Sequence, residues 1–170
     1  MSERPDAVTF QGNPLTLLGE TRRVGDAAPD ATLLNTDLDE VKLSDYAGKV
    51  RIIASVPSLD TGVCDTETRR FNEEAGKLGE VRVLTVSMDL PFAQARWCGA
   101  AGAEHVTTLS DHRDAAFGLA YGVLIQELRL LARCVFVVDR EETIRYIQLV
   151  DELTNEPDYD EVLAAAGKLT

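Results

Sequence analysis

The sequence predicts an α/β fold in which helices cover both faces of a central mixed β-sheet. Three short runs, at 50–55, 81–86 and 134–138, are almost continuously apolar and rich in β-branched residues. Such runs are typical of strands that are buried on both faces. Charged segments with helical spacing lie between and after them. No internal repeat or linker interrupts the 170 residues, so we expect one domain over 1–170.

The first elements predict an addition in front of this sheet. Residues 8–11 and 15–18 alternate in polarity and flank the turn-prone Gly12-Asn13-Pro14, which indicates a β-hairpin. We therefore treat residues 1–19 as an N-terminal hairpin extension. A short strand is expected at 31–35. A turn follows at 44–48, with a serine as cap and a glycine as its last residue.

The remaining elements complete a recognisable order. Helices are predicted at 64–78, 91–98, 113–120 and 158–169. The strand at 134–138 precedes the turn Asp139-Arg140-Glu141-Glu142, so residues 143–150 are expected to return as its antiparallel partner. A βαβ half followed by a ββα half is the layout of a thioredoxin-like fold. Fold alone does not give function.

Composition and charge exclude several classes of protein. The net charge of -12 argues against nucleic acid or an anionic membrane as the main partner. No apolar run approaches 18 residues, and no basic region with a hydrophobic stretch stands at the N-terminus, so neither a membrane span nor a secretory signal is expected. Cys64, Cys98 and Cys134 form no C-x-x-C pair. A reduced, cytoplasmic protein with one or two working thiols fits better than a disulfide scaffold or a closed zinc site.

Cys64 stands where a charged, periodic helix begins. A free cysteine with a pKa of about 8.5 is only about 3% ionised at neutral pH, and a helix N-terminus favours the reactive thiolate. Positions 64, 68, 71, 75 and 78 share one helix face, whereas Asp65 and Glu67 are expected to be solvated. Thr61 is near enough for its hydroxyl to meet the sulfur or a substrate oxygen. The alternative is that Cys64 is a small apolar residue that closes the core.

The residues around Cys64 also carry a family resemblance. Pro57-x-x-x-Thr61-x-x-Cys64 resembles the peroxiredoxin active-site motif, and residues 60–72 resemble the thiol peroxidase branch, the atypical two-cysteine peroxiredoxins. The likeness continues through 91–99, 130–133, 148–150 and 156–159, so that it covers essentially the whole chain. It implies a thioredoxin-like fold and a peroxidase that acts without metal or organic cofactor. It further implies a homodimer that thioredoxin recycles.

The resemblance assigns roles to five residues. Cys64 becomes the peroxidatic cysteine, which reduces hydrogen peroxide and organic hydroperoxides and is left as a sulfenic acid. Thr61 and Arg133 activate it, and Pro57 shields the thiolate from solvent. Cys98 becomes the resolving cysteine, which forms an intramolecular disulfide with Cys64. From the residues alone, Arg133 can also be an ordinary strand-end arginine and Cys98 a buried structural thiol.

Donors that orient the two peroxide oxygens are expected to contribute more to the rate than thiol ionisation does. The backbone amides of Val63 and Cys64 are candidates beside the Thr61 hydroxyl and the Arg133 guanidinium. Cys134 follows Arg133 on a strand, so its side chain points to the opposite face and is expected to be a core thiol.

Gly62 departs from the peroxiredoxin pattern, which has a proline at this position. The glycine either loosens the active-site loop or eases its unfolding for disulfide formation. Leu59, Phe92 and Trp97 are expected either to line an apolar approach for organic hydroperoxides or to pack in the core or a dimer interface.

Two other functions stay open at this point. One is a single-cysteine peroxidase whose sulfenic acid is resolved by an external thiol. The other is a redox-responsive binding protein, which would use oxidation as a signal without steady-state turnover.

Overall fold

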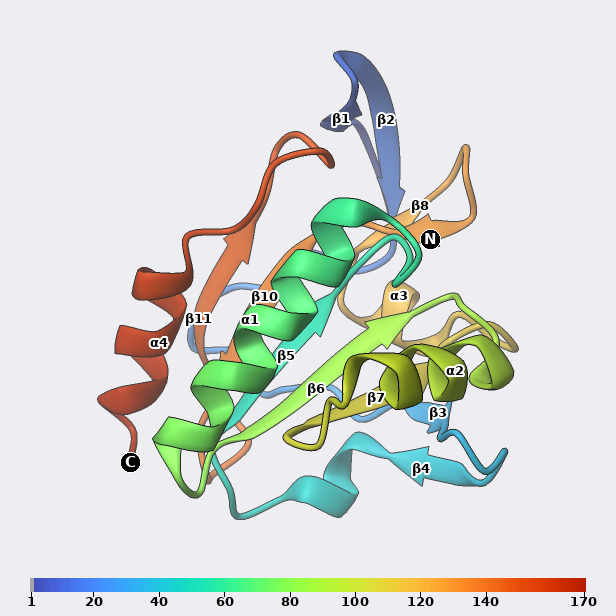
Figure 1. Ribbon diagram of the computed structural model, residues 1–170. Coiled ribbons are helices and arrows are strands. Elements are labelled where there is room, and N and C mark those ends of the chain that lie inside the picture. The colour runs from blue at the N-terminus through green and yellow to red at the C-terminus, as the bar shows by residue number, and fades with distance from the viewer. Residues whose placement is uncertain (1) are drawn as a thin grey trace.

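A seven-stranded mixed sheet forms the centre of the computed structural model, which describes residues 2–170 (Figure 1). The strand order is β11-β10-β5-β6-β7-β3-β4. The strands are β3 (Thr32–Leu34), β4 (Glu40–Lys42), β5 (Arg51–Ser55), β6 (Arg82–Ser87), β7 (Val106–Ser110), β10 (Cys134–Val138) and β11 (Ile144–Leu149). The central strands β5, β6 and β7 are parallel, and β10 and β3 pair antiparallel on either side of them. The predicted antiparallel return after 134–138 is confirmed.

Helices cover both faces of this sheet, as the sequence predicts. Helices α1 (Gly62–Leu78) and α4 (Tyr159–Gly167) pack on one face, in a cluster that contains Ile52, Phe71 and Val162. The short α3 (Ala116–Ala120) packs on the other face, against Ile53 and Phe136. Successive side chains of β5 therefore point alternately into the two clusters, one on each face of the sheet, as expected for a β-strand.

A second, four-stranded sheet confirms the predicted N-terminal hairpin. It runs β1-β2-β8-β9, from strands β1 (Glu3–Phe10), β2 (Asn13–Leu18), β8 (Leu124–Ile125) and β9 (Leu130–Leu131). The hairpin is fixed to the segment after β11 through Thr9. The Thr9 amide donates to the carbonyl oxygen of Asp151 at 2.7 Å, and the Thr9 carbonyl accepts from the amide of Leu153 at 2.9 Å. The extension is thus joined to the main body at a point far away in the sequence.

Helix α2 (Pro91–Ala101) lies beside α1 and follows β6 (Figure 1). Between these two helices a small third cluster holds Val56, Leu59, Cys64 and Trp97. Helix α2 continues three residues beyond its predicted end, and Gly102 closes it in the left-handed conformation at φ 63°. The small cluster is separate from the two main cores.

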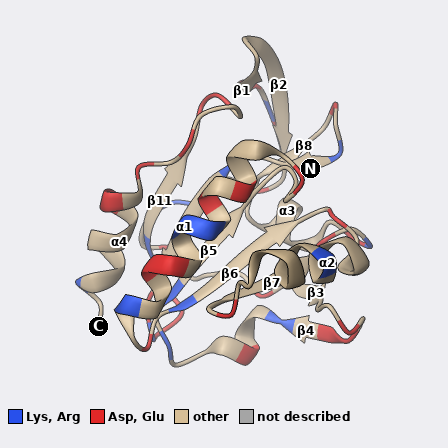
Figure 2. Cartoon of the chain, in the orientation of Figure 1, with Lys and Arg blue, Asp and Glu red and all other residues tan. Residues whose placement is uncertain are grey.

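The strand β7 and the turn of 3₁₀ helix η1 (Leu43–Tyr46) complete the fold. Strand β7 was not predicted, because Val106-Thr107-Thr108-Leu109-Ser110 carries three hydroxyl groups and gives no apolar run. Its Ser110 hydroxyl donates to the Asp89 carbonyl oxygen at 2.5 Å, so this buried polar group is satisfied. Figure 2 shows acidic and basic residues interspersed along α1. Over the described part of the chain, no helix is long and apolar enough to cross a membrane.

Candidate active site

Cys64 is the third residue of α1 and is completely buried. The helix begins two residues earlier than predicted because Thr61 caps it. The Thr61 hydroxyl accepts a hydrogen bond from the Cys64 amide at 3.2 Å and donates to the Ser58 carbonyl at 3.2 Å. The Cys64 amide, one of the donors expected to meet the peroxide, is therefore already used by Thr61. The structure places Thr61 one turn from the sulfur, in contact with backbone atoms.

Arg133 brings its guanidinium to the Cys64 sulfur. It immediately precedes β10, is 1% exposed, and places Nη2 3.3 Å from Cys64 Sγ. Its Nε and Nη2 also donate to the carbonyl oxygen of Leu153 at 3.2 and 2.8 Å. A planar guanidinium fixed by several bonds has a defined direction, which a flexible lysine would lack. The structure thus brings together Cys64 and Arg133, which are 69 positions apart in the chain.

Glu67 is the site residue that the sequence analysis missed. It was expected to be solvated, but it is completely buried, and its Oε1 lies 3.2 Å from Arg133 Nη1. Its Oε2 has no hydrogen-bond partner among the described residues. Burial raises the pKa of Glu67 to about 7, although Arg133 acts in the opposite direction; nearby Glu156 adds to the increase. Burial opposes the charged form of Arg133, yet Glu67 and Cys64 raise the pKa of this guanidinium above its ordinary value.

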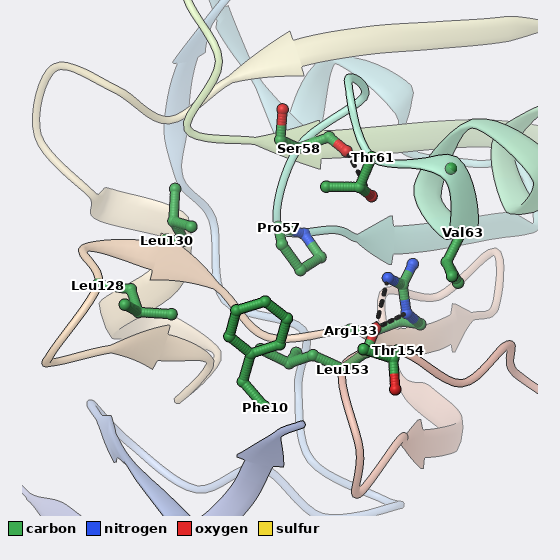
Figure 3. Close-up of a pocket in the computed structure, with 11 residues that line it drawn as sticks. Phe10, Pro57, Ser58, Thr61, Val63, Leu128, Leu130, Arg133, Leu153 and Thr154 are labelled. Atoms are coloured by element: carbon green, nitrogen blue, oxygen red, sulfur yellow. Dashed lines mark hydrogen bonds between the residues drawn. The ribbon is translucent and has the colours of Figure 1, made fainter. Parts of the chain in front are cut away.

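A pocket of about 250 Å³ reaches Arg133 from the surface (Figure 3). Most of its wall is apolar. It is lined by Phe10, Pro57, Ser58, Thr61, Gly62, Val63, Leu128, Leu130, Arg133, Leu153 and Thr154. In the view of Figure 3, Leu128 and Leu130 lie to the left and the Arg133 guanidinium to the right, with Pro57 between them. A single ionic group at one end of an apolar pocket suits a ligand with one polar end.

The apolar residues named from the sequence do not line this pocket. Leu59 and Trp97 are buried, with exposures of 3% and 8%, in the small cluster with Cys64, and Phe92 is 68% exposed on α2. The expectation that they line the approach was therefore wrong, and their alternative of core packing holds for Leu59 and Trp97. The residues that do line it come from the N-terminal hairpin, from the loop before α1 and its first turn, from the β8–β9 hairpin, and from the segments before β10 and after β11.

Cys98 lies on α2 and is half-buried, with its Sγ 3.5 Å from the Thr108 hydroxyl on β7. All three cysteines are free thiols. Cys134 is 2% exposed on the opposite face of β10, within the core cluster, and burial raises the pKa of its thiol. The prediction that Cys134 is a core thiol is confirmed. Cys98 and Cys64 each contact a different partner in this reduced state.

Gly62 is the first residue of α1, where proline is favoured in helices. A Cβ at this position would meet no heavy atom within 4 Å. The preceding Thr61 has φ -87° and ψ 147°, the extended conformation that a following proline requires. No close contact or left-handed backbone therefore demands glycine at this position.

Comparisons with known proteins show the family of the chain. A sequence model of the Redoxin family matches residues 23–163. The chain is 59% identical over 160 residues to a thiol peroxidase of Halalkalibacterium halodurans, and the alignment covers 94% of this chain and 96% of the relative. It is also 59% identical over 162 residues to the thiol peroxidase of Bacillus subtilis, and this alignment covers 95% of this chain and 97% of the relative.

The crystal structure of a peroxiredoxin-like protein from Aquifex aeolicus superimposes with a TM-score of 0.92 at 45% identity, covering 97% of this chain and 98% of the other. The family match spans most of the chain and the relatives match nearly all of it. The chain therefore belongs to the Redoxin family and, within it, to the thiol peroxidases, which are thiol-dependent peroxidases of the peroxiredoxin class.

Proposed function

We propose that Cys64 is the peroxidatic cysteine of this thiol peroxidase and that Arg133 is its principal activating partner. The observation that carries this proposal is the 3.3 Å contact between the buried Cys64 sulfur and the Arg133 guanidinium, at the end of an apolar pocket. The Cys64 thiolate attacks the terminal oxygen of R–O–O–H. An S–O bond forms, the O–O bond breaks, and the leaving oxygen takes up a proton to give R–OH. Cys64 is left as a sulfenic acid.

Orientation of the peroxide is the main source of rate in this proposal. A lower thiol pKa increases the thiolate fraction, but nucleophilicity falls at the same time, so ionisation alone gives a limited gain. Negative charge moves to the leaving oxygen as the O–O bond breaks. A guanidinium whose direction is already fixed by Leu153 and Glu67 can stabilise that charge without reorganising. Thr61 supports the helix start and offers its hydroxyl beside the pocket, and Pro57 excludes water there.

The apolar pocket supports organic hydroperoxides as substrates in addition to hydrogen peroxide. The R group would lie against the apolar wall that Phe10, Leu128 and Leu130 contribute, and the peroxide oxygens at the Arg133 end. Burial of apolar substrate surface stabilises the complex by roughly 25 cal/mol per Å². Hydrogen peroxide has no such surface and gains none of this stabilisation.

Cys98 completes the cycle as resolving cysteine. Its thiolate attacks the Cys64 sulfenic sulfur, so that an S–S bond forms and hydroxide leaves as water. A thioredoxin-type dithiol then reduces the Cys64–Cys98 disulfide by thiol–disulfide exchange. The residues need no metal or organic cofactor for these steps. We further propose that the protein works in the cytoplasm as a homodimer, each chain forming one domain over 1–170 with the hairpin as its extension.

Steady-state turnover with three cysteine variants tests this function. The measurement is NADPH oxidation with thioredoxin and thioredoxin reductase, on hydrogen peroxide and on a bulky organic hydroperoxide. Cys64→Ser should be inactive, and Cys98→Ser should reduce one equivalent of peroxide and then stop. Cys134→Ser, the matched control in the core, should turn over like the wild type. Wild-type turnover by Cys64→Ser would exclude the proposal.

Peptide mapping after one equivalent of peroxide distinguishes the remaining alternatives. A linked pair of Cys64 and Cys98 peptides is expected. Sulfenic acid without such a pair would indicate a single-cysteine peroxidase that depends on an external thiol. Oxidation of Cys64 without steady-state turnover would indicate a redox-responsive binding protein instead.

A further inference from the structure

The residues next to Cys64 and Cys98 bond to each other across the interface of α1 and α2. Trp97, which precedes Cys98, donates its indole Nε1–H to Oδ1 of Asp65, which follows Cys64, at 2.6 Å. The other oxygen of Asp65 accepts from Arg69 Nε at 2.9 Å. The Arg69 guanidinium carbon lies 5.7 Å from the centre of the Trp97 ring. Each of these three residues therefore contacts the other two.

Trp97 occupies the place on α2 that Cys98 needs. Adjacent residues of an α-helix are about 100° apart around its axis. Trp97 faces α1, is 8% exposed and packs in the small cluster with Cys64. Cys98 packs only at the edge of this cluster, and its sulfur contacts the Thr108 hydroxyl on β7. To reach the Cys64 sulfur, α2 has to rotate or unwind, and Trp97 has to leave its position.

We expect the bond between the two sulfurs to need this movement, because in the reduced state each sulfur contacts a different residue. A disulfide requires an S–S distance of about 2.05 Å and Cα atoms within about 7 Å. The two sulfurs contact Arg133 and Thr108 respectively, as free thiols. A hydrogen bond from an indole to an ionised carboxylate is stronger than one between neutral groups. Opening of α2 breaks the bond between Trp97 and Asp65 and exposes the Trp97 ring to water. The loss of the bond and the exposure of the ring both oppose the movement.

We infer that Asp65, Trp97 and Arg69 form a latch that sets the rate at which Cys98 reaches the Cys64 sulfenic acid. This inference rests on the proposed function of Cys98 as resolving cysteine. While the latch is closed, the sulfenic acid of Cys64 stays beside Arg133, which lines the pocket that admits the next peroxide. A second peroxide molecule can then oxidise it to the sulfinic acid, with R–OH as the other product. The latch thus sets how much of the sulfenic acid goes on to the disulfide and how much is oxidised irreversibly, and its three residues act by positioning α2.

The test measures the disulfide-forming step directly. Reduced enzyme receives one equivalent of hydrogen peroxide, is quenched in acid at intervals, and is analysed by mass spectrometry. Asp65→Asn should form the Cys64–Cys98 disulfide about tenfold faster, because the neutral amide is a weaker acceptor for the indole. Trp97→Phe, which lacks the N–H, should show a similar gain. Glu73→Gln removes an exposed charge from the same helix and should leave the rate unchanged.

The double variant separates a latch from a general loss of stability. If the hydrogen bond is the shared cause, Asp65→Asn with Trp97→Phe should be little faster than the faster single variant, because the two effects are not additive. Sulfinic acid formed per turnover at high peroxide should fall by the same factor as the disulfide rate rises. Multiplicative effects, or single-variant rates within twofold of the wild type, would overturn the latch.

Intrinsic fluorescence gives an independent readout, because Trp97 is the sole tryptophan of the chain. In the wild type its emission should change at the rate of disulfide formation and not at the faster rate of Cys64 oxidation. Emission that follows Cys64 oxidation would contradict the inference. A wild type that forms no Cys64–Cys98 disulfide would overturn the proposed resolving step and the latch together. A wild-type disulfide with unaffected variants would overturn the latch alone.

Discussion

Replacement of Glu67 by glutamine should change how stability depends on pH. In the folded protein, burial raises the pKa of Glu67 from an ordinary value near 4.5 to about 7. The folded state therefore binds this proton more tightly than the unfolded state does. The stabilisation from the protonated group is complete below about pH 4.5 and is lost as the pH rises through 7. The difference in pKa corresponds to about 3 kcal/mol.

The glutamine variant keeps an amide oxygen that can accept from Arg133 Nη1 but has no proton to lose. Its free energy of unfolding, relative to that of the wild type, should therefore increase by up to about 3 kcal/mol between pH 4.5 and pH 8. Urea unfolding of the reduced proteins at intervals over this range measures the difference. Glu73→Gln, at an exposed position of the same helix, serves as the control and should show a nearly constant difference.

Two results would refute this reasoning. A difference between Glu67→Gln and wild type that stays constant over the whole range would mean that Glu67 does not titrate near neutral pH. A difference that decreases with rising pH would mean that the carboxylate is stabilised in the folded state, so that the attraction of Arg133 outweighs burial. Either result would change the charge assigned to the group that holds the guanidinium.

Three further substitutions test other parts of the site. Gly62→Pro should raise the free energy of unfolding by about 1 kcal/mol, because the backbone already suits proline at this position. Urea unfolding, with Gly62→Ala as the control, measures the change, and a loss of stability would contradict the prediction. Arg133→Lys should lower the single-turnover rate of Cys64 oxidation about 100-fold, because a compact ammonium lacks the planar fork of donors that contacts Leu153, Glu67 and the sulfur. A rate within twofold of the wild type would exclude this role for Arg133. Phe10→Ala should lower kcat/KM about tenfold for a bulky organic hydroperoxide but leave hydrogen peroxide within twofold, and equal losses for both would argue against the pocket.

Periodicity and turn residues were sufficient to predict most of the fold. The hairpin, the three apolar strands and the antiparallel return after 134–138 all follow from patterns that local physics dictates. Strand β7 escaped because its polar side chains are satisfied only by partners in the folded structure, such as the Asp89 carbonyl oxygen for Ser110. A sequence pattern carries no record of such long-range partners.

The site shows the same division between local and long-range information. A helix start close to Cys64 was predicted, two residues later than in the structure, and the resemblance named Arg133. The contacts of Arg133 with Leu153 and Glu67, however, depend on tertiary structure. Glu67 was placed off the face of positions 64, 68, 71, 75 and 78 and expected to be solvated, although its spacing from Cys64 and Phe71 places it on the buried face of α1. That spacing was a usable signal, because a charged residue on an apolar stripe needs a buried partner.

The N-terminal hairpin is bonded to the segment that holds the Arg133 guanidinium. Thr9 bonds the backbone on both sides of Glu152, and the carbonyl of Leu153 in that segment accepts two bonds from Arg133. The match to the Redoxin model begins at residue 23, after the hairpin ends. A chain trimmed to that match would retain every strand of the main sheet but would lose the two backbone bonds of Thr9 to the segment that contacts the guanidinium. The hairpin contributes no strand to the main sheet, yet it is bonded to the segment that positions the Arg133 guanidinium.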